Sequence, residues 1–258
     1  MTNPQPPLWR GVAVALVTLF DADLAVDAPA TAAHAKRLVD LGVRAILVGG
    51  STGESDALTD AELADLVAAV RAACPPEVPV VAGAGGQWTA PAVARAGAVV
   101  RAGADALLVA PPRRGGNLGA YYGAVAEAAA PAALLAYHFP GVAGGEVPVD
   151  SLPGLPIQGL KDSTGNAERL LRELAAWDGA TYVGSSALAG YAGFLGAAGA
   201  ILAAANLAPE DSVAAFEGDA AAQRRLLGPH LAVQQGFPRG LKAALARRFG
   251  TAEYARLG

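Results

Sequence analysis

The chain alternates short aliphatic runs with longer segments of helical spacing, and this rhythm constrains its fold more than any other feature. The runs are continuously apolar, so each strand is expected to be covered on both faces, as in parallel β/α units. Eight units predict an α/β fold, a (β/α)8 TIM barrel, which commonly takes about 250 residues; the chain has 258. The predicted strands are Val12–Phe20, Arg44–Val48, Val78–Gly83, Ala106–Ala110, Ala133–Tyr137, Ile157–Lys161, Ala180–Val183 and Ala200–Ala203.

The segments between these runs have the spacing of amphipathic helices. In Asp60–Ala73 the leucines and valines recur on one face, and Thr59 is placed to cap the start. Cys74 follows at the predicted helix end and is expected to be a packed structural thiol. The other helices predicted between strands are Thr31–Leu41, Pro91–Ala102, Ala120–Ala130 and Asn166–Ala176.

The alternative fold is a doubly wound open sheet. Its phosphate-binding fingerprint would follow the first strand, where this chain has Asp21-Ala22-Asp23 instead. Beyond the last strand, Asp219–Val233 and Gly240–Phe249 have helical spacing. We therefore expect a barrel domain over residues 1–208 and a short C-terminal helical extension over residues 209–258, packed on the barrel.

Composition and charge exclude several classes of function. Hydrophobic residues make up 53% of the chain and charged residues 16%, so disorder is not expected. A net charge of -4 offers no cationic excess for nucleic acid or an anionic membrane. The uncharged stretch Gly179–Pro209 is long enough to span a bilayer, but its glycines divide it into a strand, a small-residue helix and another strand.

The start of the chain partly resembles an export signal, because the apolar run Val12–Phe20 follows Arg10. Acidic residues after the run and the alternative of a buried strand favour a cytoplasmic protein. A single cysteine permits no intramolecular disulfide, and the three histidines, His34, His138 and His230, never stand four residues apart. We expect no metal and no other cofactor.

Chemistry in a parallel barrel sits where the strands end at their carboxyl side. After the second predicted strand, Gly49–Ser55 is rich in glycine and hydroxyl groups, and it either holds an anion or is simply a turn. The fifth strand ends at Tyr137 and the sixth at Lys161. The chain has only three lysines among 19 basic side chains, and lysine, unlike arginine, can lose its proton when buried. Lys161 is either a nucleophile or the ion-pair partner of Asp162.

Together these strand ends resemble one family, the dihydrodipicolinate synthase/N-acetylneuraminate lyase group of pyruvate-dependent class I aldolases. Val12–Thr18 is similar to the family's first strand, and Gly50-Ser51-Thr52-Gly53-Glu54 to its carboxylate-binding motif. Tyr137–Gly141 resembles its tyrosine motif and Gly159–Gly165 its Schiff-base segment. The last two strand ends are matched by Gly184-Ser185, Gly199-Ala200-Ile201 and Ala205-Asn206. The resemblance covers nearly the whole chain.

The resemblance implies a role for each matching residue. Lys161 forms a covalent imine with pyruvate or a longer 2-oxo acid, and Tyr137 relays protons. Ser51 and Thr52 hold the substrate carboxylate, with Gly50 permitting close approach. The carbonyl of Ile201 lies near the site, as does Gly184, and Glu54 braces its loop.

Departures from the family pattern limit how far the function can be named. Val142 stands where dihydrodipicolinate synthases carry an arginine that binds the second substrate, and Arg113 stands where they carry a second tyrosine. Arg113 and Val142 are therefore candidate contacts of a different second substrate, or Arg113 faces solvent. The C-terminal helical part is shorter than is usual in the family. We expect a homo-oligomer, a dimer or a tetramer, although the short tail argues against the usual tetramer.

The leading hypothesis is a Schiff-base lyase or aldolase that forms or cleaves a 2-oxo acid from pyruvate and an aldehyde. One alternative is 4-hydroxy-tetrahydrodipicolinate synthase, which condenses pyruvate with aspartate semialdehyde in lysine biosynthesis. A second alternative is a non-catalytic barrel that binds 2-oxo acids. The sequence does not identify the aldehyde, the direction of the reaction in the cell or the assembly.

Overall fold

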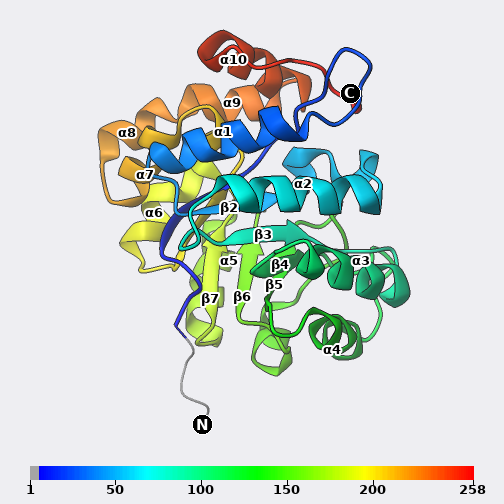
Figure 1. The fold of residues 1–258 in the computed structure, drawn as a ribbon. Helices are drawn as coiled ribbons and strands as arrows, with labels where there is room; N and C mark the ends of the chain where they lie inside the picture. Colours follow the sequence, from blue (N-terminus) through cyan, green and yellow to red (C-terminus); the bar gives the residue numbers. More distant parts are fainter. Residues whose placement is uncertain (1–5) are drawn as a thin grey trace.

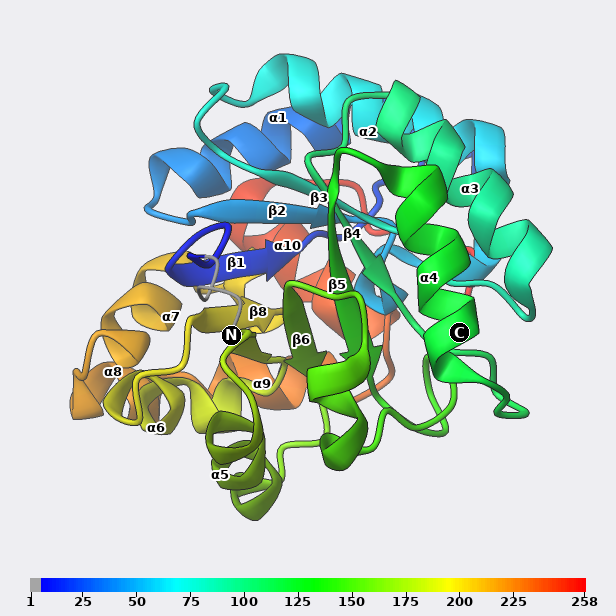
Figure 2. The same ribbon diagram turned by 90° about the horizontal axis from the view of Figure 1, so that it is seen from below.

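A computed structural model describes residues 6–258 and shows the predicted TIM barrel (Figure 1). Eight parallel strands close in sequence order, so that β8 pairs with β1. In Figure 2 the strands form a ring with helices around it, and α9 and α10 are seen behind the ring. The strands are β1 Gly11–Ala15, β2 Ala45–Val48, β3 Val80–Gly83, β4 Ala106–Val109, β5 Ala133–His138, β6 Gly159–Asp162, β7 Ala180–Val183 and β8 Gly199–Leu202.

The helices between the strands lie where the apolar spacing predicts them. Helix α2 begins after Thr59 with a capping box, because Thr59 Oγ1 accepts from the Glu62 amide at 3.2 Å and Glu62 Oε2 accepts from the Thr59 amide at 2.8 Å. Cys74 is buried at the end of α2, as expected. The helices of the barrel are α1 Ala28–Asp40, α2 Asp60–Ala73, α3 Thr89–Arg101, α4 Leu118–Ala129, α5 Ala167–Ala176 and α6 Ala189–Phe194.

The first strand is shorter than predicted, because β1 ends at Ala15 whereas the apolar run continues to Phe20. Beyond the strand, the amide of Val17 donates to Asn206 Oδ1 at 3.1 Å and that of Leu19 donates to Thr31 Oγ1 at 2.9 Å. Side chains therefore satisfy backbone groups that a neighbouring strand would otherwise pair. The apolar character of this segment reflects burial against the C-terminal helix α10, not a longer strand.

The C-terminal part contains a helix that the sequence reasoning missed, α7 (Pro209–Phe216). The predicted helix Asp219–Val233 is also divided into α8 (Ala220–Arg225) and α9 (Leu227–Gln234). Pro229 explains the break, since it has no amide hydrogen to donate back to Arg225. Helix α10 (Arg239–Phe249) agrees with its prediction. Within residues 6–258, no helix combines the length and apolar character needed to cross a bilayer.

Side chains alternate along each strand between two apolar layers. Leu134 and Ala136 of β5 pack outward against the helices, whereas Leu135 and Tyr137 point into the barrel. Tyr182 of β7 also points inward, where its ring stacks on Trp9 with centroids 4.3 Å apart. This alternation decides which strand residues face the barrel interior.

Candidate active site

Strand β6 places Lys161 inside the barrel. The register pairs Lys161 with Tyr137 of β5 and with Tyr182 of β7, and both tyrosines belong to the inner apolar layer. Asp162, the next residue, lies on the opposite face of the strand, where its carboxylate is 3.2 Å from Arg169 Nε. An ion pair between Lys161 and Asp162 is therefore not formed.

The surroundings of Lys161 favour a neutral amine. The side chain is 5% exposed, and burial lowers its pKa, while the neighbouring Tyr137 acts in the opposite direction. Its Nζ lies 4.7 Å from the centroid of the Tyr137 ring. No carboxylate among residues 6–258 forms an ion pair with it. A buried, unprotonated lysine is the form that attacks a carbonyl carbon.

Lys161 opens into a cavity of about 490 Å³ at the carboxyl end of the strands. Strand ends far apart in the sequence contribute to it, so the barrel brings most of the predicted site together. The predicted residues that line this cavity are Ser51, Thr52, Tyr137, Val142, Lys161, Gly184 and Ile201. Gly50 and Arg113 line an adjoining cavity of about 530 Å³, which Ser51, Tyr137, Val142 and Phe237 also border.

The two candidate second-substrate residues contact each other. Arg113 donates from Nη2 to the carbonyl of Val142 at 2.7 Å. Val142 borders both cavities and is 48% exposed, whereas Arg113 lines only the adjoining one. Their contact places them at the boundary between the two cavities.

The loop after β2 presents hydroxyl groups to the cavity in a short 3₁₀ turn, Ser51–Gly53. Gly49 enters this turn with a φ of 63°, a left-handed conformation that favours glycine. Thr18 Oγ1 donates to the carbonyl of Gly53 at 2.7 Å and fixes the turn against the end of β1. The first amides of such a turn have no acceptor within it, so they and the two hydroxyls can hold a carboxylate.

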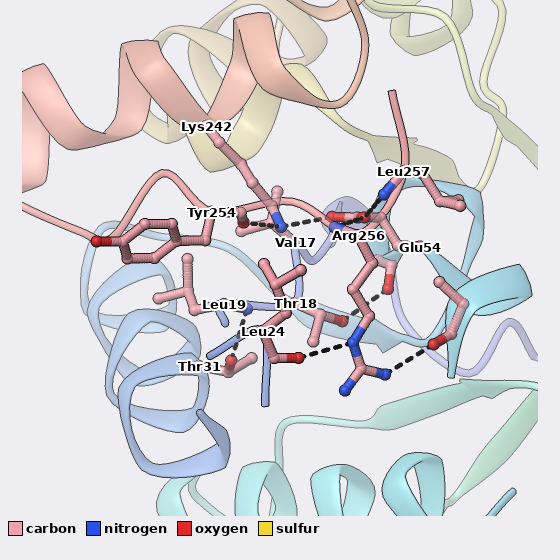
Figure 3. Close-up of polar contacts among 12 residues, drawn as sticks. Val17, Thr18, Leu19, Leu24, Thr31, Glu54, Lys242, Tyr254, Arg256 and Leu257 are labelled. Carbon is pink, nitrogen blue, oxygen red and sulfur yellow. Dashed lines mark hydrogen bonds and ion pairs between the residues drawn. The ribbon is translucent and has the colours of Figure 1, made fainter. Parts of the chain in front are cut away.

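Glu54 holds the same loop from the other side. Its buried carboxylate pairs with Lys242 of α10 and accepts from the amides of Arg256 and Leu257, each at 2.8 Å. Figure 3 shows Glu54 between the lysine and the final residues of the chain. Lys242 also donates to the carbonyl of Tyr254 at 2.7 Å. The C-terminal segment thus anchors the loop after β2, an arrangement that the sequence analysis did not predict.

The neighbouring strand ends are closely packed around the cavity. A side chain at Gly184 would collide with the Ser163 side chain, and the Gly184 amide donates to the carbonyl of Asp162 at 2.6 Å. At the end of β8, Asn206 donates to the carbonyl of Ala15 at 2.6 Å and so ties β8 to β1. Close backbone approach at Gly184 keeps β6 and β7 in register beside Lys161.

Sequence reasoning missed the contribution of the C-terminal segment to the cavity. His230, Val233 and Gln234 of α9 and the following Phe237 line the same space as Lys161. His230, Val233 and Gln234 are separated by three and four residues along α9 and so share one helical face, which the sequence could have indicated, whereas Phe237 follows the helix. The sequence pattern does not indicate, however, that this face is turned toward the barrel.

A buried acidic cluster lies behind β6, outside the cavity. Glu173 of α5 is fully buried, and burial raises its pKa to about 8, with the nearby charge of Asp162 adding to the effect. Arg169 Nε lies 2.8 Å from Glu173 Oε1 and is shared with Asp162. Among the described residues, no cluster of three or more His, Cys, Asp and Glu side chains is arranged to hold a metal ion.

The chain matches known proteins over nearly its whole length. The model of the dihydrodipicolinate synthetase family matches residues 8–250. An uncharacterized DapA-like lyase of Halobacterium salinarum is 35% identical, over 93% of this chain and 84% of the relative. The 4-hydroxy-tetrahydrodipicolinate synthase of Rhizobium meliloti is 34% identical, over 78% of this chain and 72% of the relative.

Solved structures agree with the sequence comparisons. YagE from E. coli K12, a prophage protein of the dihydrodipicolinic acid synthase family solved in complex with pyruvate, superposes with a TM-score of 0.84 at 25% identity. The match covers 93% of this chain and 88% of that one. The fold is therefore shared along nearly the whole chain.

Proposed function

This chain belongs to the dihydrodipicolinate synthetase family of lyases, and we propose that Lys161 is the residue on which its Schiff-base chemistry takes place. The family resemblance drawn from the strand ends is confirmed, and the enzyme is a class I lyase of this family. The observation that carries the proposal is a buried lysine without a carboxylate partner, facing a cavity beside a tyrosine.

The proposed reaction begins when the Lys161 amine attacks the C2 carbonyl of pyruvate. Loss of water gives a protonated imine, which withdraws electrons so that C3 can lose a proton and become an enamine. The enamine carbon attacks the carbonyl carbon of the aldehyde, and the resulting alkoxide takes up a proton. Water then hydrolyses the imine, which releases the longer 2-oxo acid and restores the lysine. Cleavage follows the same steps in reverse.

Tyr137 is proposed to carry protons during these steps. This role is supported by the ring, which lies beside Lys161 Nζ, and by the position of the tyrosine at the border of both cavities. Positioned acid–base groups typically contribute about 10²- to 10⁴-fold to a rate. Tyr137 is thus the second proposed catalytic residue.

Five residues are proposed to bind the 2-oxo acid. Ser51 and Thr52 hold its carboxylate with hydroxyls and amides, and Gly50 leaves room for the approach. Gly184 and the carbonyl of Ile201 border the same cavity at the ends of β7 and β8. The imine is formed by the protein's own lysine, so the proposed chemistry requires no metal or other cofactor.

Borohydride reduction in the presence of pyruvate tests the proposal. The wild-type protein should gain the mass of one reduced pyruvate, and Lys161→Ala should gain none. An unchanged wild-type mass would contradict the Schiff-base assignment. Trapping without turnover of any aldehyde would instead favour a barrel that binds 2-oxo acids without catalysis.

The second candidate is 4-hydroxy-tetrahydrodipicolinate synthase, the activity for which the Rhizobium meliloti relative is named. Val142 weakens this candidate because an apolar side chain stands where the resemblance expects a carboxylate-binding arginine. We expect condensation with aspartate semialdehyde to be slower than turnover of the preferred aldehyde. Equal or faster turnover of aspartate semialdehyde would make the synthase the better assignment.

We also propose a cytoplasmic homo-oligomer, a dimer or a tetramer. Its one cysteine is buried and fits a reducing compartment. Phe194 is 84% exposed and Trp88 is 62% exposed, and aromatic side chains of this kind are enriched at protein–protein interfaces. Light scattering coupled to size-exclusion chromatography measures the assembly, and a monomer at working concentration would contradict this proposal.

A further inference from the structure

Helix α9 turns one polar face toward the Lys161 cavity. His230 and Gln234 are one helical turn apart, and both line the cavity. Ser186, which follows β7, lines it as well and is 5% exposed. In the closed barrel, β7 is next to β6 on the side opposite β5. These side chains therefore flank Lys161 on the side away from Tyr137.

The hydrogen bonds among Gln234, His230 and Ser186 determine which atoms donate and which accept. Gln234 Nε2 lies 3.0 Å from His230 Nε2, and His230 Nδ1 lies 2.9 Å from Ser186 Oγ. An amide nitrogen only donates, so in this arrangement His230 Nε2 accepts and Nδ1–H donates to the serine. The Ser186 hydroxyl then keeps its own hydrogen free to donate into the cavity.

Gln223 of α8 holds Ser186 in place from behind. It donates from Nε2 to the carbonyl of Ser186 at 2.9 Å, and its Oε1 accepts from the amide of Gly190 at 2.8 Å. The serine and the imidazole are therefore fixed by contacts from two different helices. Fixed polar groups at a cavity wall discriminate between ligands better than mobile ones, because less freedom is lost on binding.

The polar groups in the cavity wall are nearly all uncharged. Within residues 6–258, the side chains that line it include neither a carboxylate nor a guanidinium, and Lys161 is its one primary amine. Hydroxyl groups provide much of its polar lining instead, among them those of Ser163, Thr164, Ser185 and Ser186. A second carboxylate or a phosphate on the substrate would find no cationic partner there, whereas neutral hydroxyl groups would find donors and acceptors.

We propose that His230 and Ser186 determine specificity for the second substrate, and that this substrate is an uncharged, hydroxylated aldehyde. The inference rests on the proposed function, because it takes Lys161 as the site of the pyruvate imine. Ser51 and Thr52 follow β2 and hold the carboxylate end, while Ser186 after β7, together with His230 of α9, binds a hydroxyl of the aldehyde portion. The C-terminal segment thereby helps to select the substrate.

Three aldehydes of similar size test the substrate class. Glyceraldehyde carries neutral hydroxyls, propanal lacks them, and succinic semialdehyde carries a carboxylate. We expect the wild-type kcat/KM, with pyruvate as the partner, to be highest for glyceraldehyde. A higher kcat/KM for propanal or succinic semialdehyde would overturn the proposed class.

The variant His230→Phe tests the residue, since phenylalanine keeps a planar ring and removes both nitrogens. It should lower kcat/KM for glyceraldehyde about tenfold, the effect of one lost hydrogen bond, and change that for propanal less than about twofold. Ser186→Ala should give the same pattern if His230→Phe folds poorly. Gln235→Ala is the matched control, because Gln235 is exposed and adjacent to Gln234 but does not line the cavity.

Borohydride trapping distinguishes a failure of the function proposed for Lys161 from a failure of the specificity role proposed for His230. We expect pyruvate to be trapped equally well by the wild type and by His230→Phe. Absence of trapping in the wild type would contradict the function proposed for Lys161 and, with it, this inference. Normal trapping, together with an equal loss on glyceraldehyde and propanal or no loss on either, would overturn the inference about His230 alone.

Discussion

Two lysines are buried in this barrel, and their surroundings differ in one decisive respect. Lys161 is 5% exposed and Lys242 is fully buried, and burial lowers the pKa of both. Lys242 has the Glu54 carboxylate and the Tyr254 carbonyl as partners, and its Nζ lies 4.3 Å from the centroid of the Phe20 ring. Lys161 has the face of Tyr137 and an open cavity.

The difference shows how one residue type serves two purposes in the same fold. At Lys242 the carboxylate opposes the effect of burial and favours the ammonium, so the pair anchors the C-terminal segment to the loop after β2. At Lys161, no carboxylate among residues 6–258 opposes the effect of burial on the pKa, so the amine is left available to attack a carbonyl. Burial alone does not make a lysine a nucleophile. The lysine must also lack a carboxylate partner and must have access to a cavity that admits the substrate.

The largest predicted effect is the loss of chemistry when the unpaired lysine is removed. Lys161→Met should abolish both pyruvate trapping and turnover, because among residues 6–258 Lys161 is the one lysine that lines the cavity. The same variant should unfold at a higher denaturant concentration than the wild type, since it removes a buried amine that lacks a carboxylate partner. Pyruvate trapping that persisted in Lys161→Met would contradict the different roles assigned to Lys161 and Lys242.

Removing one member of the paired site should instead damage stability. Lys242→Met leaves the Glu54 carboxylate buried without its cation and should lower the free energy of unfolding by about 3–5 kcal/mol, measured by urea denaturation. The double variant Lys242→Met/Glu54→Leu removes both charges and should recover part of that loss. If the loss of stability in the double variant equalled the sum of the losses in the two single variants, the two residues would not act as a pair.

Giving Lys161 a carboxylate should make it resemble Lys242. Tyr137→Glu places an acid beside the amine, and Tyr137→Gln is its uncharged control of the same size. A nearby opposite charge typically raises a lysine pKa by about 1–3, so trapping near neutral pH should be at least about tenfold slower in the Glu variant than in the Gln variant. Equal trapping rates in both would contradict an electrostatic origin of the reactivity.

The wild-type pH profile sharpens the same point. Only the neutral amine attacks, so the trapping rate should rise with pH and level off below 10.5, the ordinary pKa of lysine, because burial lowers the pKa of Lys161. Rates measured at saturating pyruvate across this range give the inflection. A plateau reached only above the ordinary value would show that burial does not favour the neutral form.

The smallest predicted effect is on stability and concerns Glu173, a buried acid that shares Arg169 with Asp162. Burial raises the pKa of Glu173 from 4.5 to about 8, so the folded protein retains a proton there that the unfolded chain has already lost. The stabilisation from this group is complete below about pH 4.5 and is lost as the pH rises toward 8. Glu173→Gln should flatten that decline and be more stable than the wild type at pH 8 by at least about 1 kcal/mol. Parallel stability profiles for the two proteins would contradict the shift.

Much of the fold could be predicted because apolar periodicity reports burial directly. The eight continuous runs correspond to the eight strands, and the spacing around Thr59 gives the start of α2. The excess length predicted for the first strand has the same origin, since Val17 and Leu19 are buried against α10 and not within a sheet. Periodicity reports that a residue is buried but not which element buries it.

The residues of the candidate site likewise fall into a group that the sequence could predict and a group that it could not. Lys161 and Tyr137 could be singled out because both stand at strand ends, and the closed barrel brings all strand ends to one rim. His230 and Lys242 could not, because they lie on C-terminal helices whose packing direction is not encoded in local spacing. Long-range contacts of this kind require the folded structure.

Site-resolved trapping tests the central claim most directly. The protein is reduced with borohydride in the presence of pyruvate near neutral pH, digested, and the peptides that contain Lys36, Lys161 and Lys242 are compared by mass spectrometry. We predict that the pyruvate adduct is confined to the Lys161 peptide. An adduct on the Lys242 or Lys36 peptide at comparable yield, or no adduct on the Lys161 peptide, would contradict the account.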